Sequence, residues 1–391
     1  MQLKIKIFIS LFFISANFLF AETQDDVAVN RSDNIPKENL DGADDQYFEG
    51  YLQALVDMHF YEYKVVVIVK DRNVWLSNMP KNALTYKSIV SFLSDVPGVK
   101  RVVVINGVPP EELEAREKYV TRPKVNGIWF PQTTTLFQPM LANPRQVTYS
   151  IGYRGNDKVA GREAVAVSLG DDFPIFRWLD VFRWHADVQI GIESGIWTVF
   201  NMDPSPNIGG GTALFNTDFY GGIPLVYSVD KWVWRLRLYH ISSHLGDEFL
   251  VNHPGFDRKN PSFEVVDLFF QYQAYEQLRF YAGAGLILHS DGTFPMRHGY
   301  FEYGFEARFW GSKIYYHNLF GTFFVATYFR NWQLNNFNLD GTYLLGYEWS
   351  KLQGVGRKIR IFGEYHHGFS PEGQFMNKRT SYWSIKVAYG F

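Results

Sequence analysis

The stretch SYWSIKVAYGF, residues 381–391, alternates between two kinds of side chain from Trp383 to its end. From there on, the odd-numbered positions are apolar or aromatic and include Trp383, Ile385 and Phe391, whereas the even-numbered positions are small or polar and include Ser384 and Lys386. Successive side chains of a β-strand point to opposite faces, so this pattern predicts a strand with one apolar and one polar face. A soluble β-sandwich would also alternate, but its surface face would not usually end on an aromatic residue. We therefore expect the apolar face to meet lipid.

Segments of the same kind recur throughout residues 146–391. There are about twelve, and single-chain bacterial outer-membrane barrels have an even number of strands. The last segment also resembles the C-terminal assembly signal of outer-membrane barrels. A sheet in lipid must close on itself, because an open edge would leave backbone groups unpaired. We expect a mainly β chain built around an antiparallel outer-membrane β-barrel of about twelve strands.

The connections between these segments are alternately short and long. The short ones are SVD (228–230), YEQ (275–277) and GSK (311–313), and the long ones include NMDPSPNIGGG (201–211). Outer-membrane barrels have short periplasmic turns and long extracellular loops. We therefore expect both ends of the barrel segment to lie in the periplasm.

The composition excludes several classes of protein. Aromatic residues make up 18% of the chain beside 33 glycines, which favours half-exposed strands. The formal net charge of -2 argues against nucleic acid as a partner, because neutralising phosphates needs a basic surface. Cysteine is absent, which excludes disulfides, a thiol nucleophile and cysteine-based metal sites.

The first 44 residues are expected to contribute no part of the fold. Residues 1–21 combine Lys4 and Lys6, an apolar run and Ala21, the pattern of a signal peptide. The alternative, a single anchor helix, would need a longer apolar run. Residues 22–44 are polar and acidic without a period, which predicts a disordered linker. No later run of about 20 apolar residues predicts a membrane helix.

In residues 45–108 apolar residues recur at regular spacings, which predict a helix, two strands, a second helix and a third strand in that order. This unit, with its ending PGVKRVVV, resembles the BON-type domain of periplasmic envelope proteins. The resemblance implies a small periplasmic module that binds an envelope component; a generic α+β spacer is the alternative. Residues 109–145 are proline-containing and aperiodic, which predicts a connector or a plug inside the barrel.

The stretch WVWRLRLYHISSHLGDEF, residues 232–249, carries the candidate site. Trp232 and Trp234 share the parity of His240 and Ser242, so an apolar face becomes polar near its end. Strand geometry places His240 about 20 Å above Trp232, near the outer interface of the membrane. On the next strand Glu264 lies at the same height and on the face that is otherwise apolar. An unpaired carboxylate would be costly there. We expect an imidazole to pair with it.

The letters YHIS resemble the His-x-Ser site of outer-membrane phospholipase A and of the lipid A 3-O-deacylase. The resemblance implies that His240 is the base and Ser242 the nucleophile, with Glu264 as our candidate to orient the imidazole. The chain departs from the common pattern at Ser243, where an Asn often follows the serine. His244 is a candidate second imidazole on the same face.

Asp247 and Glu248 follow this stretch and are the alternative third members of the triad or the ligands of a divalent cation such as calcium. No other cofactor is predicted. Alternatively, these polar residues have no catalytic role, because the ends of barrel strands near the lipid headgroups are often polar.

Over nearly its whole length, the chain also resembles an uncharacterised envelope family that carries HxSSHxGDE, here HISSHLGDE. The function predicted from these features is an outer-membrane acyl hydrolase with a Ser-His-Glu triad, acting on phospholipid or lipopolysaccharide of the outer leaflet. The competing function is a non-enzymatic porin or a structural barrel that tethers the envelope. Both place the chain in the outer membrane with its N-terminal domain in the periplasm.

Overall fold

The computed structural model describes residues 44–105, 125–131, 135–204, 210–275, 277–316, 319–350 and 356–391. The predicted signal peptide, all but the last residue of the predicted linker, and residues 109–124 of the predicted connector lie outside these ranges. Within the same ranges, no helix is long and apolar enough to cross a membrane.

A small α+β region comes first, as predicted. Helix α4 (Asp45–Phe60) begins where the Asp44 carboxylate accepts a 2.8 Å hydrogen bond from the backbone N–H of Tyr47, an N-cap. Its buried side chains recur every four residues and so form one stripe: Phe48, Leu52, Val56 and Phe60. The elements that follow are η1 (Tyr61–Tyr63), β1 (Val66–Lys70), β2 (Asn73–Ser77), α5 (Ala83–Ser94) and β3 (Arg101–Val104). Strand β2 is central, antiparallel to β1 and parallel to β3.

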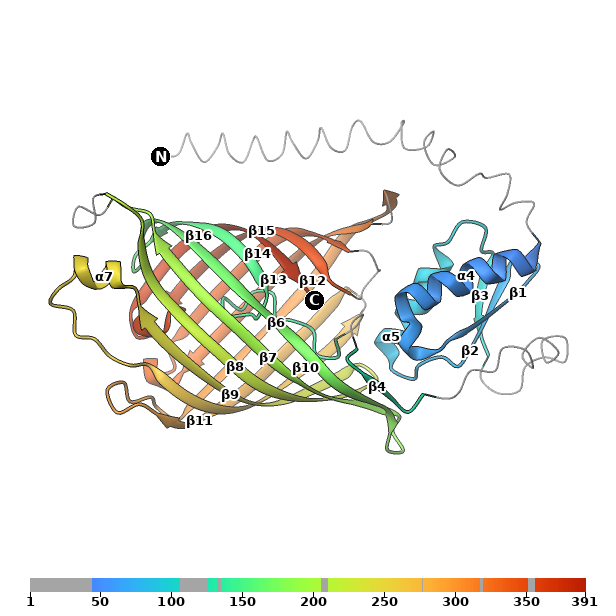
Figure 1. The fold of residues 1–391 in the computed structure, drawn as a ribbon, viewed down its shortest axis with the longest axis horizontal. Coiled ribbons are helices and arrows are strands. Elements are labelled where there is room, and N and C mark those ends of the chain that lie inside the picture. The colour runs from blue at the N-terminus through green and yellow to red at the C-terminus, as the bar shows by residue number, and fades with distance from the viewer. Residues whose placement is uncertain are drawn as a thin grey trace.

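Strands β5 to β16 then form a closed antiparallel ring, which confirms the predicted twelve-stranded barrel. The ring closes where β16 pairs with β5 and β6 pairs with β7 (Figure 1). The strands are β5 (Tyr149–Asp157), β6 (Gly161–Val181), β7 (Ala186–Asn201), β8 (Ala213–Val229), β9 (Trp232–Leu245), β10 (Ser262–Tyr275), β11 (Leu278–Ser290), β12 (Gly299–Tyr316), β13 (Leu319–Trp332), β14 (Leu339–Ser350), β15 (Lys358–Phe369) and β16 (Arg379–Gly390). The short elements between them are α7 (Asp247–Asn252), η3 (Gln333–Asn335) and η4 (Gly373–Phe375), and β4 (Gly127–Trp129) pairs with β6.

The two faces of the wall differ as the sequence predicts. On β16, Trp383, Ile385 and Val387 are exposed on the outside, whereas Ser384 and Lys386 are buried inside. The same alternation runs around the barrel, and its outer surface carries many exposed large apolar side chains. Such a surface fits the hydrocarbon layer of a membrane.

Paired charges fill the interior. The Arg237 guanidinium donates hydrogen bonds to Asp267 Oδ2 at 2.5 Å and to Glu193 Oε2 at 2.9 Å. Arg279 contacts Glu306 at 2.5 Å in the same way. Five charged side chains of β9, β10 and β12 lie on this inner face, namely Arg235, Arg237, Asp267, Glu302 and Glu306. Pairing offsets the cost of placing these charges away from water.

Residues 135–147 run inside the lumen. The Gln138 backbone N–H donates to Gln271 Oε1 at 3.1 Å, and Gln271 Nε2 donates back to the Gln138 carbonyl at 2.5 Å. The Leu141 N–H donates to Glu306 Oε1 at 2.9 Å. The buried side chains of this segment are Leu136, Phe137, Met140 and Ala142. We call residues 135–147 the lumen segment.

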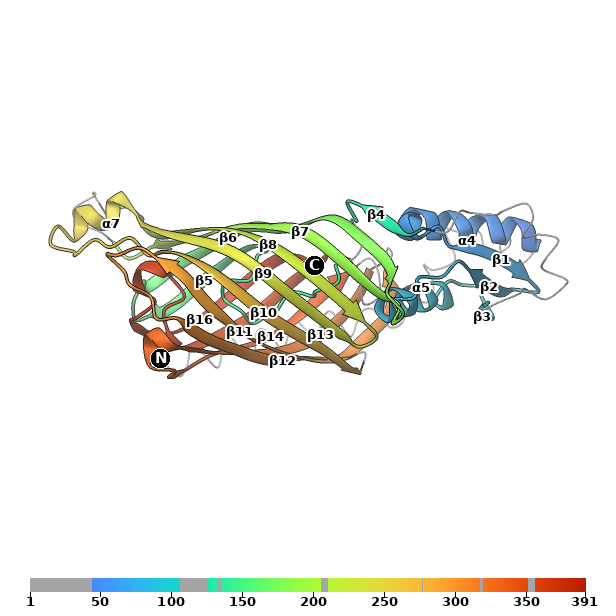
Figure 2. The ribbon, with the colours of Figure 1, turned by 90° about the horizontal axis from the view of Figure 1, so that it is seen from below.

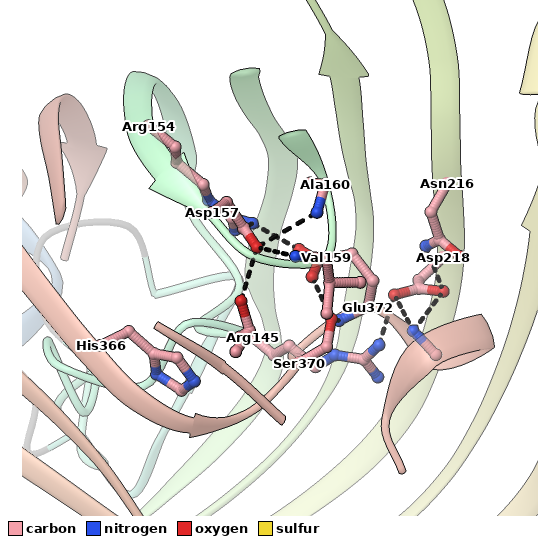
Figure 3. A network of polar contacts seen from close by, with 12 residues as sticks. Arg145, Arg154, Asp157, Val159, Ala160, Asn216, Asp218, His366, Ser370 and Glu372 are labelled. Atoms are coloured by element: carbon pink, nitrogen blue, oxygen red, sulfur yellow. Dashed lines mark hydrogen bonds and ion pairs between the residues drawn. The ribbon is translucent and has the colours of Figure 1, made fainter. Parts of the chain in front are cut away.

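The connection between β15 and β16 also lies inside the barrel, where it joins a network of polar contacts (Figure 3). Residues 370–376 are all buried, and Glu372 accepts a 2.6 Å hydrogen bond from Arg154. The Gly373 N–H donates to Asp218 at 3.1 Å, and Arg145 of the lumen segment binds the same carboxylate. A space of about 30 Å³ remains beside these groups, enough for roughly two waters at about 10–15 Å³ each. In the described part of the barrel, the lumen segment and residues 370–376 thus occupy the interior together with the paired charges.

The small α+β region is docked on the barrel. Arg177 of β6 is fully buried, and its guanidinium donates to Tyr63 Oη at 2.8 Å and to Gln189 Oε1 at 2.9 Å. Asn82 Nδ2 also donates to Ser228 Oγ at 2.9 Å. Both views show this region beyond one end of the barrel and α7 at the opposite end (Figures 1 and 2).

Candidate active site on the outer wall

The outward face of β9 changes character along the strand. Trp232, Trp234, Leu236 and Leu238 are exposed on it, and the next outward residue is His240. The two tryptophan rings stack with their centres 6.3 Å apart at the apolar end, which lies away from α7. The switch from apolar to polar that the sequence predicts for this face is therefore present.

His240 meets Glu264 on the outside of the wall. The two residues are directly opposite in the β9–β10 ladder, and His240 Nδ1 lies 2.8 Å from Glu264 Oε1. Both side chains are half-exposed, at 48% and 39%. Because a carboxylate oxygen can only accept, Nδ1 carries the proton and Nε2 is left to face outward as an acceptor.

A second imidazole binds the same carboxylate. His289 of β11 is directly opposite Glu264, and its Nδ1 lies 2.8 Å from Oε2. His289 is two residues from Ile287, which is buried, so regular strand alternation would point both side chains into the lumen. The β10–β11 register shifts between Glu264 and Val265, so β11 has one extra residue there, and both Leu288 and His289 are exposed. A bulge of this kind redirects a side chain and leaves no plain sequence pattern, which is why parity misses His289.

Ser242 lies two residues beyond His240 on the same face. It is half-buried and stands opposite Ser262 of β10. Among the described residues, no hydrogen bond joins its hydroxyl to His240. Side chains at this spacing start roughly 6–7 Å apart at the backbone, and hydrogen bonds between catalytic groups often tighten only when substrate is bound.

The wall is open beside His240 on the β8 side. Gly221 is directly opposite His240 in the β8–β9 ladder, and a Cβ added to it would meet no atom within 4 Å. The flanking outward residues Phe219 and Ile223 are large and exposed. Gly221 therefore leaves a space without a side chain beside His240, which we call the notch.

Of the other residues predicted for the site, Ser243 and His244 lie on opposite faces of β9. Ser243 points inward, is buried, and donates to Asn216 Oδ1 at 3.1 Å, so it does not share the face of Ser242. His244 is on the outer face, with its ring edge-on to Phe219 at 5.7 Å.

Asp247 and Glu248 lie in the first turn of α7. Within the described ranges, no group of three or more His, Asp and Glu side chains could hold a metal ion. Calcium binding by this pair therefore stays a prediction.

One further carboxylate lies in the loop next to His289, outside the strands. Hydrogen bonds from the Thr293 hydroxyl and backbone, and from Asn260, lower the pKa of Asp291 below its ordinary value. The proximity of His289 acts in the same direction. The polar end of the wall thus carries two carboxylates: Glu264, which contacts His240 and His289, and Asp291, which lies close to His289.

Comparison with known proteins identifies a family. A family model described as "Protein of unknown function (DUF1207)" matches residues 59–391. No curated protein matches the chain. Outer membrane phospholipase A from Escherichia coli is 11% identical, with 63% of this chain and 92% of that chain covered and a TM-score of 0.42.

Two other solved barrels match at a similar level. LpxR from Salmonella typhimurium is 11% identical, with 62% of this chain and 100% of that chain covered and a TM-score of 0.34. The NanC porin is 9% identical, with 63% of this chain and 100% of that chain covered and a TM-score of 0.33. Likenesses this weak assign no activity to the chain.

Proposed function

The chain belongs to the DUF1207 family, whose description assigns no activity, and from its outer wall we propose that it is an outer-membrane acyl hydrolase that cleaves esters of membrane lipids. Ser242 is the nucleophile, His240 the general base and then the general acid, and Glu264 the residue that orients the imidazole. The observation that carries the proposal is the 2.8 Å contact between His240 Nδ1 and Glu264 Oε1 on the lipid-facing side.

The chemistry follows from that contact. With Nδ1 held by Glu264, His240 Nε2 accepts the Ser242 proton while the hydroxyl oxygen bonds to the ester carbonyl carbon. The carbon–oxygen bond to the lipid alcohol then breaks, and His240 returns the proton to the departing oxygen. A water, deprotonated by His240, then bonds to the acyl carbon; the bond from that carbon to Ser242 Oγ breaks, His240 returns the proton to Oγ, and the fatty acid is released. The Glu264 charge stabilises the imidazolium formed in each half of the reaction.

The position of the three groups suits a lipid substrate. Aqueous substrates are reached from a cleft or a lumen, whereas these side chains project from the apolar outer wall where it becomes polar. Lipid esters are found at that boundary between hydrocarbon and headgroups. The substrate class is therefore phospholipid or lipopolysaccharide of the outer leaflet.

The rest of the chain fits an envelope protein of this kind. The docked α+β region lies at the end of the barrel opposite α7 (Figure 1), and we assign it to the periplasm, where it binds an envelope component in the manner of a BON-like module. The alternative of a non-enzymatic tethering barrel is supported by this docking. The porin alternative is disfavoured by the filled lumen.

The test compares two neighbouring serines. Ser242→Ala removes the proposed nucleophile, and Ser243→Ala is the matched control because Ser243 faces the lumen. Both variants should keep the heat-modifiable migration of a folded barrel in a detergent gel. Fatty acid release from vesicles of phospholipid and lipopolysaccharide, with and without calcium, should be lost only in Ser242→Ala. Wild-type protein that releases no fatty acid from either lipid would refute the hydrolase.

A further inference from the structure

An apolar groove runs across the outer wall below the site. It has a volume of about 600 Å³. Its outward lining consists of hydrocarbon side chains from β9 to β12 and from the loop after β13, namely Leu236, Val266, Leu268, Ala284, Leu286, Phe301 and Phe337. The groove is thus a hollow in a surface that is otherwise covered by large apolar side chains.

The strand registers explain how the hollow arises. One row of directly opposite residues runs Leu236, Leu268, Ala284 and Phe301, and the next runs Leu238, Val266, Leu286 and Gly299. Ala284 and Gly299 are the small members of these rows. Since neighbouring strands lie roughly 4.8 Å apart, rows that cross four strands extend roughly 14 Å.

The polar site is the next row up. His240, Glu264 and His289 are directly opposite one another across β9, β10 and β11, two residues beyond Leu238 and Val266 on their strands. Two residues of strand correspond to roughly 7 Å. The polar row is therefore adjacent to the row of Val266, Leu286 and Gly299, which forms one edge of the groove.

From this arrangement we infer that the groove holds one acyl chain of a membrane lipid, which fixes the ester against His240 and Ser242; the inference rests on the proposed function. The occupant is a hydrocarbon chain because the lining offers carbon to a ligand and lies within the apolar outer belt. The chain is part of an intact lipid because the groove meets a charged row at its border. The groove thus makes the substrate a long-chain lipid ester rather than a short soluble one.

The variant Ala284→Phe tests this assignment. A phenyl group at this exposed position fills the groove and leaves the catalytic row untouched. The matched control is Ala307→Phe, since Ala307 is on the same outer face of β12 but outside the groove. Wild type and both variants are placed in vesicles that contain phosphatidylethanolamine with a diazirine midway along one acyl chain. Crosslinked peptides are then quantified by mass spectrometry.

We expect crosslinks concentrated on peptides that contain residues 284–286 and 299–301, at least fivefold weaker in Ala284→Phe and unchanged in Ala307→Phe. Fatty acid release from long-chain lipid should fall at least tenfold in Ala284→Phe, through a higher KM, while a butyrate ester is cleaved at the wild-type rate. Crosslinks spread evenly around the barrel, or equal in all three proteins, would overturn the inference.

The two proposals fail separately. If all three proteins hydrolyse lipid equally and crosslink equally, the groove assignment is wrong and the hydrolase stands. If wild type crosslinks in the groove but releases no fatty acid, the hydrolase is wrong and lipid binding in the groove is supported alone.

Discussion

His240 and Glu264 stand directly opposite each other in the β9–β10 ladder, and their side chains meet at 2.8 Å on the outside of the barrel. An outward carboxylate on an apolar wall is costly unless it is paired. Here the pairing also fixes the orientation of an imidazole two residues before an outward serine. The contact thus links the stability of the wall to the proposed chemistry.

The first prediction concerns that carboxylate. Glu264→Gln keeps the size of the side chain but removes the charge that stabilises the imidazolium and selects the tautomer. Fatty acid release should fall on the order of 100-fold or more, because the equivalent change in serine hydrolases costs more still. Rates are measured on lipid vesicles with the heat-modifiable migration as the folding control. An unchanged rate would remove Glu264 from the mechanism.

The second prediction concerns access to His240. Gly221→Leu closes the notch beside the ring without a clash, since an added Cβ would meet nothing within 4 Å. Gly363→Leu is the matched control on β15, where the nearest atom to an added Cβ is 3.9 Å away. We expect at least a tenfold loss of fatty acid release in the first variant and none in the second. Equal rates in the two variants would show that the ligand does not use the notch.

The third prediction concerns the lumen. Because the lumen segment and residues 370–376 fill the interior, the wild-type barrel should show no stable conductance in a planar bilayer. Replacing residues 136–142 by a Gly/Ser sequence removes the buried side chains that occupy the pore, so stable conductance steps should appear. Conductance steps in the wild type would contradict the filled lumen and favour a porin.

The fourth prediction concerns the docked domain. Tyr63→Phe removes the phenol that accepts a hydrogen bond from the buried Arg177 guanidinium at 2.8 Å. A hydrogen bond to a charged group contributes about 1.5–3 kcal/mol, so docking should weaken by that order. Trypsin should then cleave between the domain and the barrel at least fivefold faster. An unaltered cleavage rate would mean that other contacts hold the interface.

Much of the fold can be predicted from the local alternation of apolar and polar residues. Strict alternation in segments such as Trp232–Leu238 predicts both the strands and the direction in which each side chain points. An even number of such segments with alternating turn lengths predicts closure. The pairing of Glu264 with an imidazole, here that of His240, follows from parity and height on neighbouring strands.

The features that the sequence did not predict depend on contacts between distant segments. His289 joins the site only because an extra residue in β11 shifts the β10–β11 register, and such a bulge leaves no change in composition. The connector was predicted without a choice between the periplasm and the lumen, because its place is set by Gln271 and Glu306, more than 100 residues away. The sequence also gives no sign that Gly221 lies beside the site, because this follows only from its pairing with His240 on the neighbouring strand.

The central claim is that Ser242 attacks an ester from the lipid-facing wall. The most direct measurement is trapping of the nucleophile with a long-chain alkyl fluorophosphonate in native vesicles, with the modified residue read by mass spectrometry. The account predicts a single adduct on Ser242 that is abolished by Glu264→Gln and accompanied by loss of fatty acid release. An adduct on another serine, or none in a protein that still hydrolyses lipid, would contradict it.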